Sequence, residues 1–336
     1  MNELTSLRDL GEALDRELRG PSPQLRHKVI TDICGRPGRA RQRLPRLGAG
    51  RRLVVTAALA VVLAGALLVA STLRLWGGSP AASAQAAEIL RLAAVTAKHQ
   101  PALTAGPSQF IYVKSVESGA QITVSGRITH LQIITDLREI WLSAAGTRNG
   151  LLREQRRSPA SLGRPAGPWQ TIPLPGCRDG RLNPVAGGGS SNGHCTPTPA
   201  YLAGLPTSTQ AMLAYLYQHS QGQNPPDVQA FITAGDLIRE SYARPAALAA
   251  LFAAAAQIPG VSVAGHAVNA AGQQGVAVQQ AFHGTSHQLI FNPRTHAFIG
   301  EREVVVSASS GLPVGTVLDS TAVLRLAVVD HVGQLP

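Results

Sequence analysis

The feature that most constrains this chain is an apolar run from Leu53 to Leu73, twenty-one residues without a charge, Asn, Gln or Pro. At about 1.5 Å per residue, a helix of this length spans about 31 Å, which matches the hydrocarbon core of a bilayer. Core helices of soluble proteins rarely extend so far without a polar face. The run therefore predicts a single transmembrane helix over residues 53–73.

Arginine is concentrated on the N-terminal side of this run. Residues 36–52 contain no acid and seven arginines, namely Arg36, Arg39, Arg41, Arg43, Arg46, Arg51 and Arg52. Residues 74–103 contain only Arg74, Arg91 and Lys98, against Glu88. By the positive-inside rule, we expect residues 1–52 to be cytoplasmic and the C-terminal part to lie outside the cell membrane. The arginines are then best placed to contact anionic lipid of the inner leaflet rather than nucleic acid.

A cleaved secretory signal is the main alternative interpretation of the apolar run. The tripeptide Ala82-Ser83-Ala84 resembles a signal peptidase site. However, a preceding region of about fifty residues and an apolar region of twenty-one are both too long for a signal peptide. No cysteine lies near the end of the run, which excludes a lipoprotein anchor.

The segment before the span contains two short amphipathic patterns. The first places a leucine face on one side of a helix, formed by Leu4, Leu7, Leu10, Leu14 and Leu18. The sequence Gly20-Pro21-Ser22-Pro23 ends it, and a second helix is expected over residues 24–33. Two such helices cannot form a core alone, so they dock on a partner, self-associate or lie on the membrane surface.

Residues 74–86 read as a linker of small residues, and residues 87–336 as an extracytoplasmic α+β domain. Its helices are expected at 87–98, 207–220, 227–240 and 245–257. Strands are expected at 110–114, 121–131, 139–143, 151–156, 261–268, 275–282, 288–291, 298–307 and 317–329. Turns are expected at Ser118-Gly119 and Asn149-Gly150, and residues 158–200, rich in Gly, Pro and Ser, are expected to be a loop. This order predicts one antiparallel sheet covered on one side by helices.

The three cysteines are Cys34, Cys177 and Cys195. On the predicted topology, Cys177 and Cys195 lie outside the cytoplasm, where a disulfide between them is favoured. Closing such a loop is worth about 3 kcal/mol in the chain-entropy model. A zinc site at His194 and Cys195 is disfavoured because no fourth ligand is suitably spaced. Cys34, on the reducing side, is expected to be a plain thiol.

No motif for nucleophilic, phosphate-binding or metalloprotease chemistry is present in the sequence. His283 and His287 are four apart, but their surroundings predict a hairpin turn rather than a helix face. We therefore expect no enzyme activity, no cofactor and no metal.

One extracytoplasmic charge pattern has two interpretations. Residues 148–181 contain seven arginines, Arg148, Arg153, Arg156, Arg157, Arg164, Arg178 and Arg181, against Glu154 and Asp179. They either attract anionic envelope lipid or polymer, or form an ordinary solvated surface, which is the preferred interpretation.

Several segments resemble an actinobacterial family of single-pass membrane proteins of unassigned function. They are Asn2 to Leu10, the arginine run with the span, Gln109 to Ser115, Leu205 to Thr207, Ala234 to Glu240, Ile258 to Val261, Leu289 to Gly300 and Val329 to Gly333. The resemblance covers nearly the whole chain. Members of this family are commonly encoded beside extracytoplasmic-function sigma factors, which implies a membrane-tethered anti-sigma regulator.

The outer domain also resembles the LolA/RseB half-barrel, a curved antiparallel sheet whose concave side is closed by helices and can hold acyl chains. The resemblance rests on element order and on the hairpin after Phe291, where Asn292 and His296 replace the usual Asp and Gly. A further departure lies in the cytoplasmic segment. Of the zinc motif that many anti-sigma factors carry, only His27 and Cys34 are present there, so any such action would be zinc-free.

These patterns predict a non-enzymatic, membrane-tethered regulator, anti-sigma-like or an envelope sensor. Its partners would be membrane lipid, a sigma factor at the leucine face, and a lipid or other envelope ligand outside, without direct contact with nucleic acid. The alternative is a membrane-anchored module that binds lipid or lipoprotein in the cell envelope.

Overall fold

The computed structural model describes residues 80–125, 128–158, 161–185, 194–220, 222–308 and 312–336. The chain divides into two units, Met1–Trp76 and Gly77–Pro336, and all described residues belong to the second. The expected N-terminal helices, the arginine run and the span at 53–73 lie outside the described residues. Within the described ranges, no helix has the length and apolar character needed to cross a bilayer.

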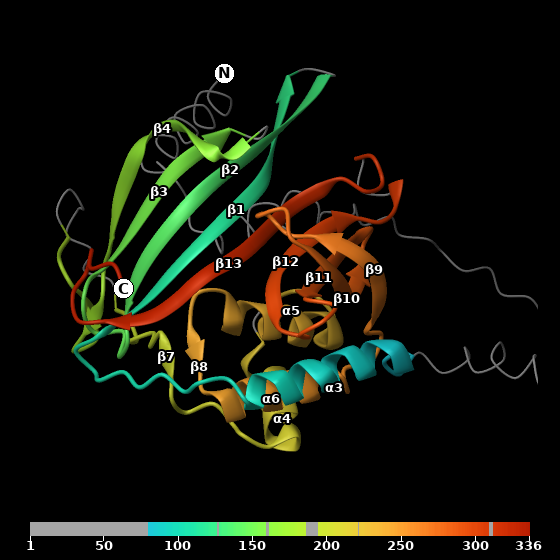
Figure 1. Cartoon of the computed structure of the whole chain (residues 1–336), viewed down its shortest axis with the longest axis horizontal. Helices are drawn as coiled ribbons and strands as arrows, with labels where there is room; N and C mark the ends of the chain where they lie inside the picture. The colour runs from blue at the N-terminus through green and yellow to red at the C-terminus, as the bar shows by residue number, and fades with distance from the viewer. Residues whose placement is uncertain (1–79, 126–127, 159–160, 186–193, 221, 309–311) are drawn as a thin grey trace, which may run out of the picture. The chain divides into compact units, whose positions relative to one another are not determined.

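One antiparallel sheet of nine strands organises the described unit (Figure 1). The strands are β1 (Phe110–Ser125), β2 (Ile128–Ser143), β3 (Gly150–Ser158), β4 (Ser161–Leu174), β9 (Ser262–Val268), β10 (Gln274–Phe282), β11 (Thr285–Phe291), β12 (Phe298–Val305) and β13 (Val317–Val329). Their spatial order is β4-β3-β2-β1-β13-β12-β11-β10-β9. Two runs of consecutive hairpins, β1–β4 and β9–β12, thus form the two halves of the sheet, and β13 joins them.

The described helices are α3 (Ala84–Lys98), α4 (Thr209–His219), α5 (Pro226–Arg239) and α6 (Pro245–Ala255). The hydroxyl of Ser83 accepts a hydrogen bond from the amide of Ala86, which explains why α3 begins three residues before the expected start. Proline in the first turn favours the starts of α5 and α6, because its fixed φ suits a helix and its missing N–H has no partner to lose. Two short strand pairs complete the unit: β5 (Cys177–Arg178) with β6 (Arg181–Leu182), and β7 (Tyr201–Leu202) with β8 (Tyr242–Ala243).

The helices pack on one face of the sheet, which we call the helix-side face. In the β9–β12 half, Phe252 of α6 lies in one core cluster with Val278, Leu289 and Phe291. In the β1–β4 half, the same face carries Ile111, Val113 and Ile140, which pack against Tyr242 and Ala200. The opposite, outer face carries a smaller aromatic cluster that contains Tyr112 and Trp141. The expected α+β class with one antiparallel sheet is therefore confirmed.

The expectation of a turn at Ser118-Gly119 is wrong. Both residues lie inside β1, paired with Thr135 and Ile134 of β2, and the Ser118 and Thr135 hydroxyls lie 2.8 Å apart. The strands expected at 110–114 and 121–131 are therefore parts of one hairpin, in which β1 and β2 pair as far as Ser125 and Ile128. Glycine marks a turn only where its conformation is needed, and here cross-strand pairing on both sides of β1 keeps the backbone extended.

The expectation of a loop over residues 158–200 is also wrong in part. Its first third forms β4, which pairs with β3 and lies at the edge of the sheet. Pro165 and Pro173 sit in β4 opposite Arg157 and Leu151. An edge strand needs hydrogen bonds on one side only, so it tolerates prolines that would disrupt a central strand.

The hairpin turn expected around His283 is confirmed, and the hairpin after Phe291 has a tight turn although two of its usual residues are replaced. His283 and Gly284 both have positive φ and connect β10 to β11, so His283 and His287 do not share a helix face. In the β11–β12 turn, Asn292 Oδ1 accepts hydrogen bonds from the amides of Arg294 and Thr295. His296 takes a φ of 57°, the left-handed conformation that glycine usually provides. The replacement residues thus still build a tight turn.

Candidate functional site

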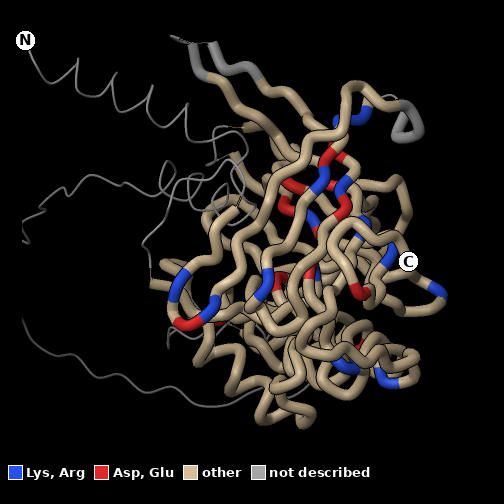
Figure 2. Tube along the Cα trace, turned by 90° about the vertical axis from the view of Figure 1, so that its left-hand side faces the viewer, with Lys and Arg blue, Asp and Glu red and all other residues tan. Residues whose placement is uncertain are grey.

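Seven charged residues gather on the helix-side face where the two halves of the sheet meet. Along β1 and β2 this face changes from apolar, at Val113 and Ile140, to charged, at Glu117 and Arg138. The buried charge cluster, as we call it, consists of Glu117, Arg138, Glu154, Arg239, Glu240, Glu301 and Asp319. Figure 2 shows acidic and basic residues side by side in the middle of the unit.

Arg138 is the centre of the β1–β4 side of the cluster. Its side chain is only 4% exposed, and its guanidinium contacts three carboxylates: Glu117 at 2.7 Å, Glu154 at 2.9 Å and Glu240 at 2.5 Å. Burial lowers the pKa of Arg138, but the three carboxylates more than offset this effect and raise it above its ordinary value. Arg138 therefore stays charged, and the three acids depend on it for compensation.

Arg239, the last residue of α5, forms the other side of the cluster. Its Nε donates to Glu301 of β12, and its Nη2 lies 3.8 Å from Asp236. Gly235 makes this approach possible, because a Cβ at this position would lie 2.6 Å from Glu301 Oε2. Burial lowers the pKa of Arg239, but Glu301 and other carboxylates raise it overall.

The end of α5 thus connects both halves of the sheet through consecutive residues. Arg239 pairs with β12, and Glu240 pairs with Arg138 of β2. Buried pairs of this kind add little net stability, but breaking one leaves an uncompensated charge. A displacement of one half against the other would therefore be resisted at this point, which makes the end of α5 a coupling element.

Asp319 of β13 is the member of the cluster with the weakest compensation. Within the described residues, its Oδ1 is buried and accepts no hydrogen bond. Burial first, and then Glu117, raise the pKa of Asp319 to about 7, although the charge of Arg239 opposes this rise. Its charge consequently changes near neutral pH, at the strand that joins the two halves.

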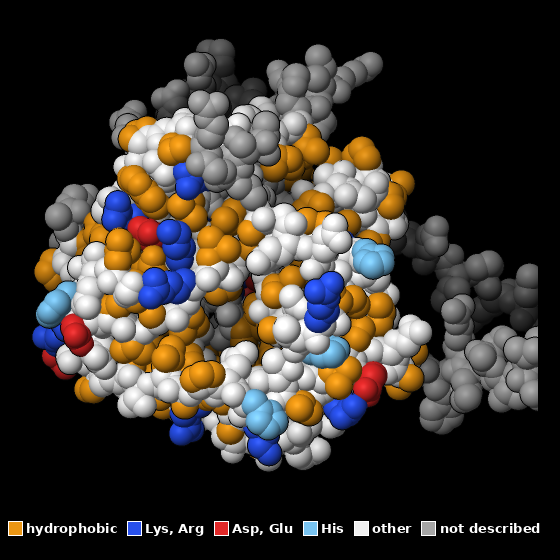
Figure 3. Space-filling model, in the orientation of Figure 1, with side chains coloured by type: hydrophobic (Ala, Val, Ile, Leu, Met, Phe, Trp, Pro, Cys, Tyr) orange, Lys and Arg blue, Asp and Glu red, His pale blue; other side chains and the backbone are white. Residues whose placement is uncertain are grey.

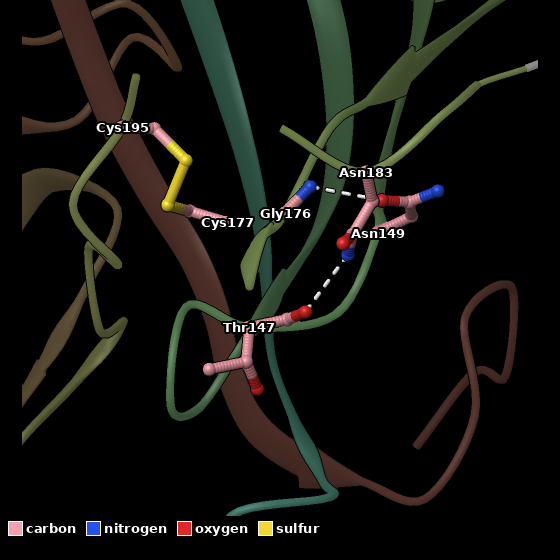
Figure 4. Close-up of a disulfide and its surroundings, with 6 residues drawn as sticks. All are labelled: Thr147, Asn149, Gly176, Cys177, Asn183 and Cys195. Atoms are coloured by element: carbon pink, nitrogen blue, oxygen red, sulfur yellow. Dashed lines mark hydrogen bonds between the residues drawn. A yellow bond between two sulfur atoms is a disulfide. The ribbon is translucent and has the colours of Figure 1, made fainter. Parts of the chain in front are cut away.

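The disulfide expected between Cys177 and Cys195 is formed in the structure (Figure 4). Asn149 and Asn183 hold the adjoining backbone: Asn149 Oδ1 accepts from the Gly176 amide, and Asn183 Nδ2 donates to the Thr147 carbonyl. Because its sulfur is bonded to Cys177, Cys195 is not available as a zinc thiolate. Among the described residues, no group of three or more His, Cys, Asp or Glu is arranged to hold a metal ion.

Six of the seven arginines of residues 148–181 have described side chains, and the structure separates these six. Arg153 and Arg157 lie on the outer face of β3, while Arg156 lies on the helix-side face and donates to Asp136. Arg178 and Arg181 are exposed on the β5–β6 hairpin, and Arg148 stacks over the Phe110 ring. The arginines therefore do not form one basic patch, although some of them contribute to charge rows set by the sheet.

The remaining candidate residues from the sequence fall outside the described part of the chain. They are the leucine face (Leu4, Leu7, Leu10, Leu14 and Leu18) and the seven arginines between residues 36 and 52. The buried charge cluster was not predicted from the sequence. A signal for it exists, since the strict alternation of β1 and β2 places Glu117 and Arg138 on the same face as Val113 and Ile140.

Comparisons with known proteins give a distant structural similarity. No family model and no curated protein matches the chain. Among solved structures, it is similar to a chain of the Pseudomonas aeruginosa MucA/MucB complex, with 13% identity, a TM-score of 0.27, 75% of this chain covered and 59% of the other. MucB alone gives 15% identity, a TM-score of 0.26 and coverages of 76% and 61%. MucB in complex with MucA(peri) gives 12% identity, a TM-score of 0.24 and coverages of 72% and 55%. The chain thus spans about three fifths of the length of these structures.

Proposed function

We propose that this protein is a membrane-tethered, non-enzymatic regulator. Its extracytoplasmic domain responds to the state of the envelope, and residues 1–52 contact a cytoplasmic partner, for which a sigma factor is the best candidate. The observation that carries this proposal is the coupling of the two sheet halves by Arg239 and Glu240 at the end of α5. Because buried charges join the two halves, rather than surround a nucleophile, a change that a ligand favours in one half would be transmitted to the other.

The sequence supplies the other support for this proposal. The apolar run of residues 53–73 gives a route across the membrane, and the leucine face of residues 4–18 is an amphipathic surface with nothing of its own to pack against. The disulfide between Cys177 and Cys195 suits an oxidising compartment outside the cytoplasm.

The lipid-carrier alternative is less well supported. It needs an apolar concavity on the helix-side face to receive acyl chains. In the β9–β12 half, side chains of α5 and α6, including Phe231, Leu251 and Phe252, already fill this face and are at most 1% exposed. In the β1–β4 half, Tyr242 and Ala200 pack there.

The test is capture of partners by the full-length chain from membranes of its own host, after crosslinking and mild solubilisation. The variant carries Leu7→Asp, Leu10→Asp and Leu14→Asp. Its control carries Thr5→Asp and Arg16→Asp, which change the net charge by the same amount on the opposite helix face. We expect a sigma factor with the native chain and the control, and its loss with the leucine variant.

Two results would contradict the proposal. A sigma factor recovered equally with all three chains would show that the leucine face is not the contact. The absence of any sigma factor, together with lipid that copurifies in stoichiometric amount with Gly77–Pro336, would favour the carrier alternative instead.

A further inference from the structure

A row of four charged residues, continued by a threonine, crosses the outer face of the sheet over five neighbouring strands. Strand register places Arg325 of β13 opposite Lys114 of β1, Lys114 opposite Glu139 of β2, Glu139 opposite Arg153 of β3, and Arg153 opposite Thr171 of β4. Directly opposed residues of an antiparallel pair point to the same face. These five side chains therefore form one line at right angles to the strands, although they are scattered between residues 114 and 325.

The row holds three cations and one carboxylate. Glu139 is nearly buried, with its carboxylate 3.6 Å from Lys114 Nζ, 3.7 Å from Arg153 Nη1 and 3.3 Å from the Tyr112 hydroxyl that donates to it. Burial, followed by Glu139, raises the pKa of Tyr112 to about 12, so this hydroxyl remains a donor. Glu139 can balance one positive charge, and two remain.

The arrangement of the cations lowers the stability of the folded domain when nothing is bound to it. Lys114 and Arg325 are direct cross-strand neighbours, and like charges in this position repel each other. On the helix-side face of the same strands, by contrast, Arg138 has three carboxylate partners. An anion bound over Lys114 and Arg325 would relieve the repulsion, because it would supply the charge that the row lacks.

The cations of the row are accessible and partly fixed in place. The side chains of Lys114 and Arg153 are 36% and 31% exposed, and Arg325 is exposed. The Arg153 guanidinium stacks over the Trp169 ring, 4.7 Å from its centroid, which limits its motion. Figure 3 shows Lys and Arg side chains gathered over the β1–β4 half of the sheet.

We propose that the cation row, defined as Arg325, Lys114 and Arg153, is a binding surface for the anionic head groups of the membrane in which this chain is anchored. The choice of a bilayer rests on the membrane span of the proposed function. Ten residues, 74–83, separate the expected span from α3. Fully extended, they reach at most about 36 Å, so the domain stays within its own diameter of an anionic surface. Cations near such a surface are attracted within about one Debye length.

The test uses the unit Gly77–Pro336, which contains the whole sheet, its core clusters and the disulfide and forms a compact unit by itself. Its binding is measured by co-sedimentation with vesicles of phosphatidylcholine and with vesicles containing about one third phosphatidylglycerol. The variant carries Lys114→Gln and Arg325→Gln. The control carries Arg178→Gln and Arg181→Gln, exposed residues of the β5–β6 hairpin that give the same change of net charge. Thermal unfolding of both variants establishes that they are folded.

We expect binding to the anionic vesicles only, which weakens as salt is added. The row variant should lose affinity about tenfold or more, and the control less than about twofold. Equal losses in both variants would overturn the proposal, since net charge alone would then explain binding. Absence of binding to vesicles would also overturn it, and binding of soluble polyphosphate under the same conditions would identify a polymer as the occupant instead. None of these results bears on sigma-factor capture by residues 1–52, so the two proposals fail separately.

Discussion

The two faces of the sheet differ in how their positive charges are compensated. On the helix-side face, Arg138 is surrounded by three carboxylates and almost inaccessible to water. On the outer face, Lys114, Arg153 and Arg325 share one carboxylate and remain in contact with solvent. A buried charge must be compensated for the protein to fold, whereas an exposed one can be left uncompensated at small cost. The difference separates charges that hold the fold together from charges that are free to bind a partner.

Among the substitutions that test this difference between the two faces, removal of Arg138 should have the largest effect on stability. Arg138→Met would leave Glu117, Glu154 and Glu240 buried beside one another without a cation. We expect a loss of about 3–5 kcal/mol in the free energy of unfolding. Urea unfolding of the unit Gly77–Pro336 measures it. A loss no larger than that of Lys114→Gln on the outer face would mean that the two faces do not differ as described.

Neutralising Asp319 should stabilise the protein, and only above acidic pH. The pKa of Asp319 is about 7 in the fold against 3.8 as the ordinary value, so the neutral form stabilises the fold below about pH 4. That contribution is lost as the pH rises through about 7. After allowance for partial exposure, Asp319→Asn should gain about 2 kcal/mol over the native chain at pH 8 and almost nothing at pH 4.

The same urea titration, repeated at the two pH values, provides the measurement. The matched control is Asp330→Asn, an exposed carboxylate at the end of β13, which should show no such difference. An Asp319→Asn variant that is less stable than the native chain at pH 8 would indicate that Arg239 holds Asp319 ionised.

Loss of the ring beneath Arg153 should have a smaller effect on stability. Trp169→Ala removes the stacking of the Arg153 guanidinium, worth about 1 kcal/mol at an exposed site. Vesicle binding should weaken at the same time, because Arg153 is no longer held in the row. Trp169→Phe keeps a ring and should restore most of both properties. If vesicle binding is unchanged in the alanine variant, Arg153 does not belong to the binding surface.

The smallest effect on stability should come from substitutions of Arg325, which should stabilise the fold rather than destabilise it. Arg325→Gln removes the like-charge contact with Lys114 and should raise the free energy of unfolding by about 0.3 kcal/mol. Arg325→Glu, which creates an opposite-charge pair, should raise it further and abolish vesicle binding. A stability that falls in both variants would argue against repulsion between these two residues.

Elements with strong periodicity were predictable from the sequence, and those shaped by their neighbours were not. Helices α5 and α6 and strands β9 to β13 are confirmed within a few residues, because their apolar spacing was clear. Strand β4 was missed because Pro165 and Pro173 indicate a loop unless the strand is known to lie at an edge. Likewise, the glycine at 119 indicated a turn that pairing with β2 and β13 prevents.

The candidate site and the cation row depend on strand register, which the alternation of side chains within a single strand does not reveal. Two of the three cations of the row, Lys114 and Arg325, are more than two hundred residues apart, and only the pairing of β1 with β13 brings them together. Of the seven arginines in residues 148–181, the three on β3 are instead divided between the two faces of the sheet by the alternation of that strand. Density of charge along the chain was therefore a poor guide to density of charge in space.

The position of β13 has a consequence for how the domain is made. Each half of the sheet consists of hairpins between consecutive strands, which pair residues that are close together in the chain and can therefore form early. Both β1 and β12, however, pair with β13, which follows the other eight strands of this sheet in the chain. Until β13 pairs with it, β1 exposes the edge of Phe110 to Gly119 to the surroundings. A chaperone that covers this edge would be most useful to the chain during that interval.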